Sequence, residues 1–110
     1  MPFIEAGRIT EIEPVPGFHG RMVHTETMTL AEWVIDAAAA IPEHAHPEEQ
    51  VTRILEGRLE LTIAGESRAL EPGDVAVMRS NVPHAGRALT RCRVIDVWHP
   101  AREDYRAVGR

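Results

Sequence analysis

The fold of this chain is decided by one stretch, Pro42-Glu43-His44-Ala45-His46-Pro47-Glu48-Glu49-Gln50. Alternate residues of a β-strand share one face, so the stretch predicts that His44 and His46 project together at the separation of metal ligands. Imidazole is a ligand for zinc, copper, iron and nickel. Pro47 is expected to interrupt the strand and bend the chain, which returns Gln50 to the same cavity.

A further ligand has to come from another part of the chain, and His84 is the best candidate because it directly follows the turn Asn81-Val82-Pro83. Two acidic neighbours of Gln50, Glu48 and Glu49, are expected to be solvated, although either would replace it as a ligand if the loop turned differently. The remaining histidines are expected to be structural or solvated: His19, His24 and His99.

Turn residues recur about every 8 to 12 positions from Gly57 onward, a spacing typical of an all-β sandwich or barrel. Within residues 58–63, three apolar side chains alternate with polar ones: Leu59, Leu61 and Ile63. This is the period-2 pattern of a half-buried strand. The second half of the chain is therefore predicted to be a series of short strands.

Residues 91–98 are predicted to form a late strand rich in Val and Ile. In such a strand Asp96 and Trp98 share one face, and His99 has the opposite parity and points away from it. A hairpin turn is predicted over residues 64–67, and a further strand is predicted over residues 74–78.

Residues 28–40 contain Leu30, Ala31, Glu32 and four consecutive alanines, all of which are good helix formers. A helix is one interpretation of this segment. We favour a strand, because bulky β-formers sit in its middle and no N-cap pattern with matching periodicity precedes it. The end of the chain, residues 101–108, is expected to form a short helical turn or a trailing arm.

Composition excludes several classes of protein. The chain has 110 residues, which suits one domain, residues 1–110. Its formal charge is −5 and it has no dense basic run, which argues against nucleic-acid binding. Cys92 is the only cysteine, so neither an intrachain disulfide nor a cysteine-based zinc site is expected. No signal peptide or membrane span is recognised, so the expected compartment is the cytoplasm.

Two motifs in the chain resemble those of the cupin superfamily. The first family motif reads Gly, five residues, His-x-His, three or four residues, Glu, six residues, Gly. Here His44-Ala45-His46 is followed after three residues by Gln50 and after six more by Gly57. The second motif reads Gly, five residues, Pro-x-Gly, two residues, His, three residues, Asn, and here Gly73 and His84 stand at the matching offsets.

The chain departs from both motifs mainly at turn positions, with Ala38, Arg79, Asn81 and Ala88 in place of Gly, Pro, Gly and Asn. The chemical departure is Gln50, which keeps an oxygen ligand but removes a negative charge. Three neutral imidazoles and one amide leave the charge of a bound ion uncompensated, which favours anionic oxygen ligands such as carboxylates. The set also differs from the two-His, one-carboxylate triad of many iron oxygenases.

Gln50 and the C-terminal run from Val94 to Tyr105 are similar to the KdgF-type pectin-degradation cupins. This resemblance implies a role in converting 4,5-unsaturated monouronates, released from pectin or alginate, to linear keto acids. It implies that Asp96 and Arg102 are catalytic. It also implies that Trp98 and Arg102 bind substrate, and Trp98 stands where Phe is usual in the family. The alternative is that Asp96 and Arg102 form an ordinary salt bridge and that Trp98 belongs to the core.

The resemblance implies an all-β fold, a double-stranded β-helix or jelly-roll-like barrel. We expect one divalent ion, Zn, Ni, Mn or Fe, on His44, His46, Gln50 and His84. The expected activity is lyase or isomerase chemistry on a small carboxylate-bearing sugar. The alternatives are a dioxygenase or isomerase acting on another small molecule, and a non-catalytic protein that binds a small ligand. The small barrel and its apolar residues 28–41 predict a homodimer.

Overall fold

A computed structural model describes residues 2–108, which form ten β-strands with a short helical segment near each end. A 3-10 helix spans Ala6–Arg8, and helix α1 spans Glu103–Val108. The strands are β1 (Glu11–Val15), β2 (Phe18–His24), β3 (Thr29–Ile35), β4 (Ala40–His44), β5 (Glu49–Glu56), β6 (Leu59–Ile63), β7 (Glu66–Leu70), β8 (Val75–Met78), β9 (His84–Ala88) and β10 (Cys92–His99).

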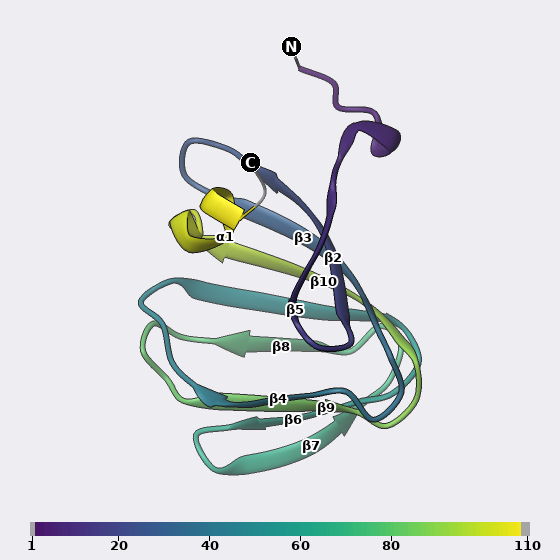
Figure 1. Cartoon of the computed structure of the whole chain (residues 1–110). Helices are drawn as coiled ribbons and strands as arrows, with labels where there is room; N and C mark the ends of the chain where they lie inside the picture. Colours follow the sequence, from purple (N-terminus) through teal and green to yellow (C-terminus); the bar gives the residue numbers. More distant parts are fainter. Residues whose placement is uncertain (1, 109–110) are drawn as a thin grey trace.

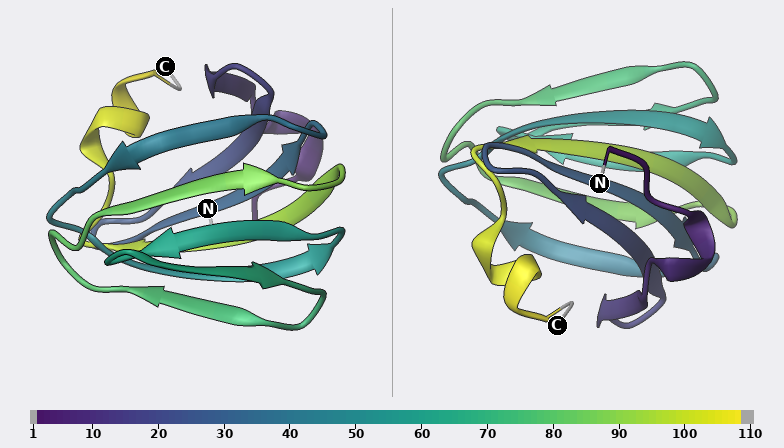
Figure 2. Two further views of the ribbon diagram at one scale, coloured as in Figure 1. Left: turned by 90° about the horizontal axis from the view of Figure 1, so that it is seen from below. Right: turned by 90° about the horizontal axis from the view of Figure 1, so that it is seen from above.

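The strands form two antiparallel sheets that face each other (Figures 1 and 2). One sheet has six strands in the order β1-β2-β3-β10-β5-β8, and the other has four in the order β4-β9-β6-β7. The all-β prediction is therefore confirmed. Strand β10 lies in the middle of the larger sheet, between β3 and β5, and this position puts its inward-facing side chains at the centre of the molecule.

The predicted hairpin after residue 63 joins β6 to β7 through a tight two-residue turn. Ala64 and Gly65 both have positive φ angles, 49° and 83°. Two consecutive left-handed residues give the turn whose twist matches that of the paired strands. Leu59 and Leu61 of β6 are buried, as the alternating pattern predicted.

The segment 28–40 is not a helix. Residues 29–35 form β3, in which buried and exposed positions alternate, so the strand prediction is confirmed there. The first three of the four alanines, however, form the turn to β4, in which Ala38 has a φ of 70°. Asn81 also has a positive φ, 63°. Both residues occupy positions at which the family motifs have Gly. These positions therefore keep a positive φ angle in this chain although the residue is not Gly.

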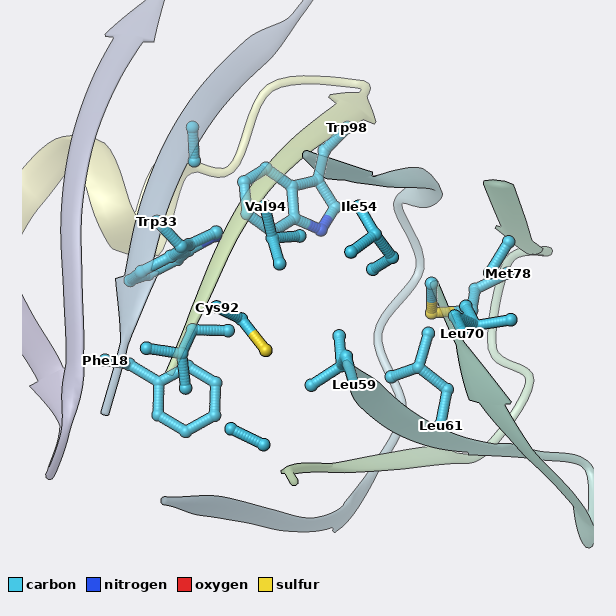
Figure 3. Close-up of a cluster of buried hydrophobic side chains, with 14 residues drawn as sticks. Phe18, Trp33, Ile54, Leu59, Leu61, Leu70, Met78, Cys92, Val94 and Trp98 are labelled. Carbon is cyan, nitrogen blue, oxygen red and sulfur yellow. The ribbon is translucent and has the colours of Figure 1, made fainter. Parts of the chain in front are cut away.

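The hydrophobic core lies between the two sheets (Figure 3). The larger sheet contributes two tryptophans, Trp33 and Trp98, and the smaller sheet contributes Leu59 and Leu61. Phe18 meets the Trp33 ring edge-on at a centroid distance of 6.1 Å. The buried polar side chains adjoin this core, and they are Thr29, Gln50, Thr52, His84, Asp96 and Arg102. Within residues 2–108, no helix is long and apolar enough to cross a membrane.

Candidate metal centre

Three imidazoles converge between the two sheets. His44 ends β4 and pairs with His84, the first residue of β9, and their ring centroids lie 4.3 Å apart. The ring of His46 lies 4.9 Å from that of His84. One ring nitrogen of each histidine lies within 4.8 Å of the others, so the three could hold a metal ion.

The prediction that His44 and His46 project from one strand is wrong in one respect. Strand β4 ends at His44, and the pairing of β4 with β9 shifts register just before it. His46 therefore belongs to the loop that leads into β5. The chain bends at Pro47 and Glu48 as predicted, but the strand has already ended at His44. The loop backbone rather than the strand pleat therefore brings the second imidazole to the first.

Each imidazole is oriented by a backbone carbonyl two residues away. The contacts are His44 Nδ1 to Pro42 O at 2.8 Å, His46 Nδ1 to Glu48 O at 2.9 Å and His84 Nδ1 to Val82 O at 2.9 Å. A carbonyl oxygen only accepts, so every Nδ1 carries the proton and donates it. In the neutral rings each Nε2 is then a lone-pair donor for a metal.

Burial keeps two of these rings neutral. It lowers the pKa of His46 and of His84 below the usual value for histidine, because desolvation disfavours the imidazolium. His84 Nε2 is buried and has no hydrogen-bond partner among the described residues. An unsatisfied buried acceptor is costly unless something binds it, and a metal ion would satisfy it.

Gln50 brings a fourth acceptor to the cluster. Its Oε1 lies 2.8 Å from Trp98 Nε1 and 3.2 Å from His46 Nε2. An indole N–H only donates, so the Gln50 atom that faces it is the oxygen. With His46 neutral, two acceptors face each other without a proton between them. The residues present therefore fit a divalent cation.

A buried hydrogen-bond network lies behind Gln50. The Gln50 amide Nε2 donates to Thr52 Oγ1 at 3.0 Å, and Thr52 donates to Asp96 Oδ1 at 2.5 Å. Trp33 Nε1 donates to Asp96 Oδ2 at 2.9 Å. Burial nevertheless raises the pKa of Asp96 to about 6, because desolvation outweighs these hydrogen bonds.

Arg102 lies beside the same cluster, and its side chain is only 9% exposed. Its guanidinium stacks on Tyr105 at 4.2 Å and on Trp98 at 5.1 Å from the ring centroids. One edge of the guanidinium pairs with Asp104, and Glu48 Oε1 lies 3.8 Å from Arg102 Nε. No ion pair joins Asp96 to Arg102 in the described part of the chain, so the simple salt bridge between them is not observed.

A cavity of about 70 Å³ connects these groups. The sites predicted from sequence that line it are His44, Gln50, His84, Asp96, Trp98 and Arg102. Its opposite wall is apolar and includes Ile41 and Leu61. His99 is exposed on the other face of β10, as its parity predicted.

Sequence reasoning missed two residues of the network, Thr52 and Trp33. Thr52 stands two residues after Gln50 in β5, so strand parity alone places both side chains on one face. Trp33 gave no such signal. It reaches Asp96 only because β3 and β10 are neighbours, a pairing between residues far apart in the sequence.

Comparison with known proteins agrees with this architecture. The family model described as Cupin domain matches residues 31–98. The chain belongs to the cupin family. No curated protein sequence matches this cupin.

Solved structures resemble this cupin over nearly its whole length. The RmlC-like cupin from Shewanella frigidimarina is 24% identical, with a TM-score of 0.89 and 96% of each chain covered. KdgF from Halomonas sp. is 27% identical, with a TM-score of 0.87, and 96% of this chain and 98% of that chain are covered. Bacillus subtilis oxalate decarboxylase OxdC, at 19% identity and a TM-score of 0.76, shares the fold over 88% of this chain and 29% of its own.

Proposed function

We propose that this cupin binds one divalent metal ion through His44, His46, Gln50 and His84 and acts on a small acidic sugar. The observation that carries the proposal is the convergence of four acceptor atoms in a buried pocket. Three are imidazole nitrogens whose Nδ1 protons are used elsewhere, and the fourth is an amide oxygen fixed by Trp98. Such a set of neutral ligands suits Zn, Ni, Mn or Fe.

The substrate class follows from the charges around the cavity. When bound, the ion supplies a Lewis acid that attracts anionic or polarisable oxygen atoms. Arg102 is buried beside it, and its free guanidinium edge offers hydrogen bonds to a carboxylate. The wall opposite is apolar and includes Ile41 and Leu61. These charges favour a small substrate that carries a carboxylate, such as a monouronate.

Asp96 is the proposed proton-transfer group. It lines the cavity, and its pKa of about 6 lies close to neutral pH, where a general acid or base works best. The donors Thr52 and Trp33 fix the carboxylate in one orientation and leave a lone pair of each oxygen for a proton. The proposed reaction is the ring opening and ketonisation of a 4,5-unsaturated monouronate, and the likeness to KdgF at 27% identity supports this choice.

Metal binding is tested by elemental analysis of the wild type, His46→Ala and His99→Ala. We expect the wild type and His99→Ala to hold about one ion per chain and His46→Ala to lose most of it. His99 is the matched control because it is an exposed histidine outside the cluster. Equal metal content in His46→Ala and the wild type would refute the site.

Catalysis is tested by following the loss of the conjugated ultraviolet absorbance of 4,5-unsaturated galacturonate and its epimer. Asp96→Asn should lower turnover by roughly 10²–10⁴-fold with the metal retained. Arg102→Lys keeps the charge but loses the planar fork, so a higher KM is expected. A metal-loaded wild type that binds uronates without turning them over would be a binding protein, and oxygen consumption by the iron form would indicate a dioxygenase.

A further inference from the structure

The side chains of Trp98 and Gln50 face each other directly across the β10–β5 pair. Both are buried, with exposed fractions of 2% and 8%. The next inward-facing pair along these strands is Asp96 and Thr52. Sheet register thus stacks two cross-strand pairs side by side, where neighbouring side chains reach one another.

The hydrogen bonds between these pairs run in a single direction. The Trp98 indole N–H can only donate, so Gln50 must present Oε1 to it at 2.8 Å. The Gln50 amide nitrogen then has to face Thr52 and donate to its hydroxyl. The hydroxyl proton of Thr52 is left for Asp96, which accepts it on Oδ1. The indole donor at one end and the Asp96 carboxylate at the other therefore favour the same orientation of the Gln50 amide.

The direction matters because an amide side chain has two different ends. Without the indole donor, the Gln50 amide could rotate by half a turn and donate its NH₂ to His46 Nε2, which lies 3.2 Å from the present Oε1. That arrangement would satisfy the lone pair of His46 in the metal-free protein. It would also point two hydrogens at the place where a cation has to bind.

We propose that Trp98 is a positioning residue for the metal site, whose indole N–H holds the Gln50 amide in the oxygen-forward orientation. The inference rests on the proposed metal site and adds a residue that holds the oxygen of Gln50 toward that site in this chain. A site that exists in only a fraction of molecules binds correspondingly more weakly, so Trp98 acts by preorganisation.

The first measurement is Zn²⁺ affinity, by competition with a chromophoric chelator, for the wild type, Trp98→Phe and Trp33→Phe. Loss of an orienting partner typically weakens metal binding about 10- to 100-fold, and we expect this for Trp98→Phe. Trp33→Phe is the matched control because it also removes a buried indole donor, but one that serves Asp96 rather than Gln50. Its affinity should stay within about threefold of the wild type.

The decisive measurement repeats Trp98→Phe in a Gln50→Glu background. A carboxylate has oxygen at both ends, so it has no wrong orientation for the indole to prevent. We expect the effect of Trp98→Phe on Zn²⁺ affinity to shrink to less than about threefold there. If Trp98 served only core packing, its replacement would weaken binding equally in both backgrounds, and that result would overturn the proposal.

A second readout does not depend on metal. In the metal-free protein, the side-chain amide NMR signals of Gln50 should move in Trp98→Phe as its NH₂ leaves Thr52. If Trp98→Phe does not fold, benzothienylalanine at position 98 keeps the ring shape and removes only the N–H, and the same weakening is expected. Unchanged affinity in that variant would overturn the proposal, whereas a wild type that binds no Zn²⁺ or Co²⁺ would refute the metal site itself.

Discussion

Arg102 donates to both carboxylate oxygens of Asp104, from Nε at 3.0 Å and from Nη2 at 2.8 Å. The hydrogen bond from Arg102 lowers the pKa of Asp104 below its usual value, so Asp104 is ionised at neutral pH. Asp104 therefore already shares the positive charge of the guanidinium that a carboxylate bound at the free edge would also use. Helix α1 supplies an internal competitor for the proposed substrate.

Asp104→Asn should bind galacturonate about two- to fivefold more tightly, which is the range that an exposed ion pair contributes. Arg102 should keep its place, because it also stacks on Tyr105 and Trp98. Calorimetric titration of the metal-loaded protein measures the effect. Glu103→Gln is the control, since Glu103 pairs with Arg106 and should leave affinity unchanged. Weaker binding by Asp104→Asn would instead show that Asp104 positions Arg102 for the ligand.

The pKa of Asp96 predicts how the stability of the metal-free protein depends on pH. Its folded-state pKa is raised from 3.8 to about 6, so the folded protein holds a proton between these values that the unfolded chain has lost. The contribution of this proton to the free energy of unfolding is fully present below pH 3.8 and is lost as the pH rises through 6. The shift corresponds to roughly 3 kcal/mol at about 1.4 kcal/mol per pH unit.

The comparison that isolates Asp96 is urea unfolding of the wild type and Asp96→Asn from pH 4 to pH 8 in the presence of a chelator. Asn carries no charge at any pH, so the variant should become progressively more stable relative to the wild type as the pH rises, and then level off above pH 7. Other groups, including the buried histidines, titrate in both proteins and cancel in the difference. A constant difference across the range would mean that Asp96 has an ordinary pKa.

Ala38 has an unfavourable backbone conformation in the turn between β3 and β4, where its φ is 70°. A left-handed backbone costs an L-residue with a Cβ roughly 1–2 kcal/mol, and glycine avoids the cost but gains entropy in the unfolded chain. Ala38→Gly should therefore raise the free energy of unfolding by about 0.5–1 kcal/mol. Ala37→Gly, next to it but without a positive φ, should lower it by a similar amount. An equal decrease in the free energy of unfolding in both variants would contradict this explanation.

The sequence predicted those parts of the centre that depend on local spacing. Motif offsets singled out His44, His46 and His84, and their convergence is confirmed. Strand parity correctly separated His99 from Trp98. For Trp98 and His99 the information lies within one strand, where alternation of side chains decides the geometry. For the histidines the motif offsets identified the ligands, although the strand pleat does not position His46.

The network behind the metal ligands could not be predicted in this way. The bond between Trp98 and Gln50 joins residues 48 positions apart, and it requires β10 to pair with β5 in one particular register. A shift of a single residue would turn the side chains to the other face. The pairing of Arg102 with Asp104 is local, but nothing in the sequence showed that the helix would keep it at the cavity.

Oligomeric state is the remaining prediction. The outer face of the larger sheet carries an apolar row in which side chains on neighbouring strands are direct register partners: Leu30, Val97, Val51 and Val77. Leu30, Val51 and Val77 are 45%, 41% and 55% exposed in the single chain. Phe3 and Ile4 of the N-terminal segment are also exposed. A continuous exposed apolar surface is more often a site of interaction with another protein than a part of the surface that faces only solvent.

We predict a homodimer in which the N-terminal third, including Leu30, contributes to an interface on this outer face. Light scattering at micromolar concentration should give twice the mass of one chain for the wild type. Val51→Lys introduces a charge into the middle of the row and should shift the protein to monomers without disturbing the cavity, because Val51 points away from it. Leu89→Lys is the control and should remain a dimer. Leu89 is an exposed apolar residue that directly follows β9, a strand of the other sheet. A monomeric wild type would contradict the prediction, and a dimeric Val51→Lys would move the interface to another surface.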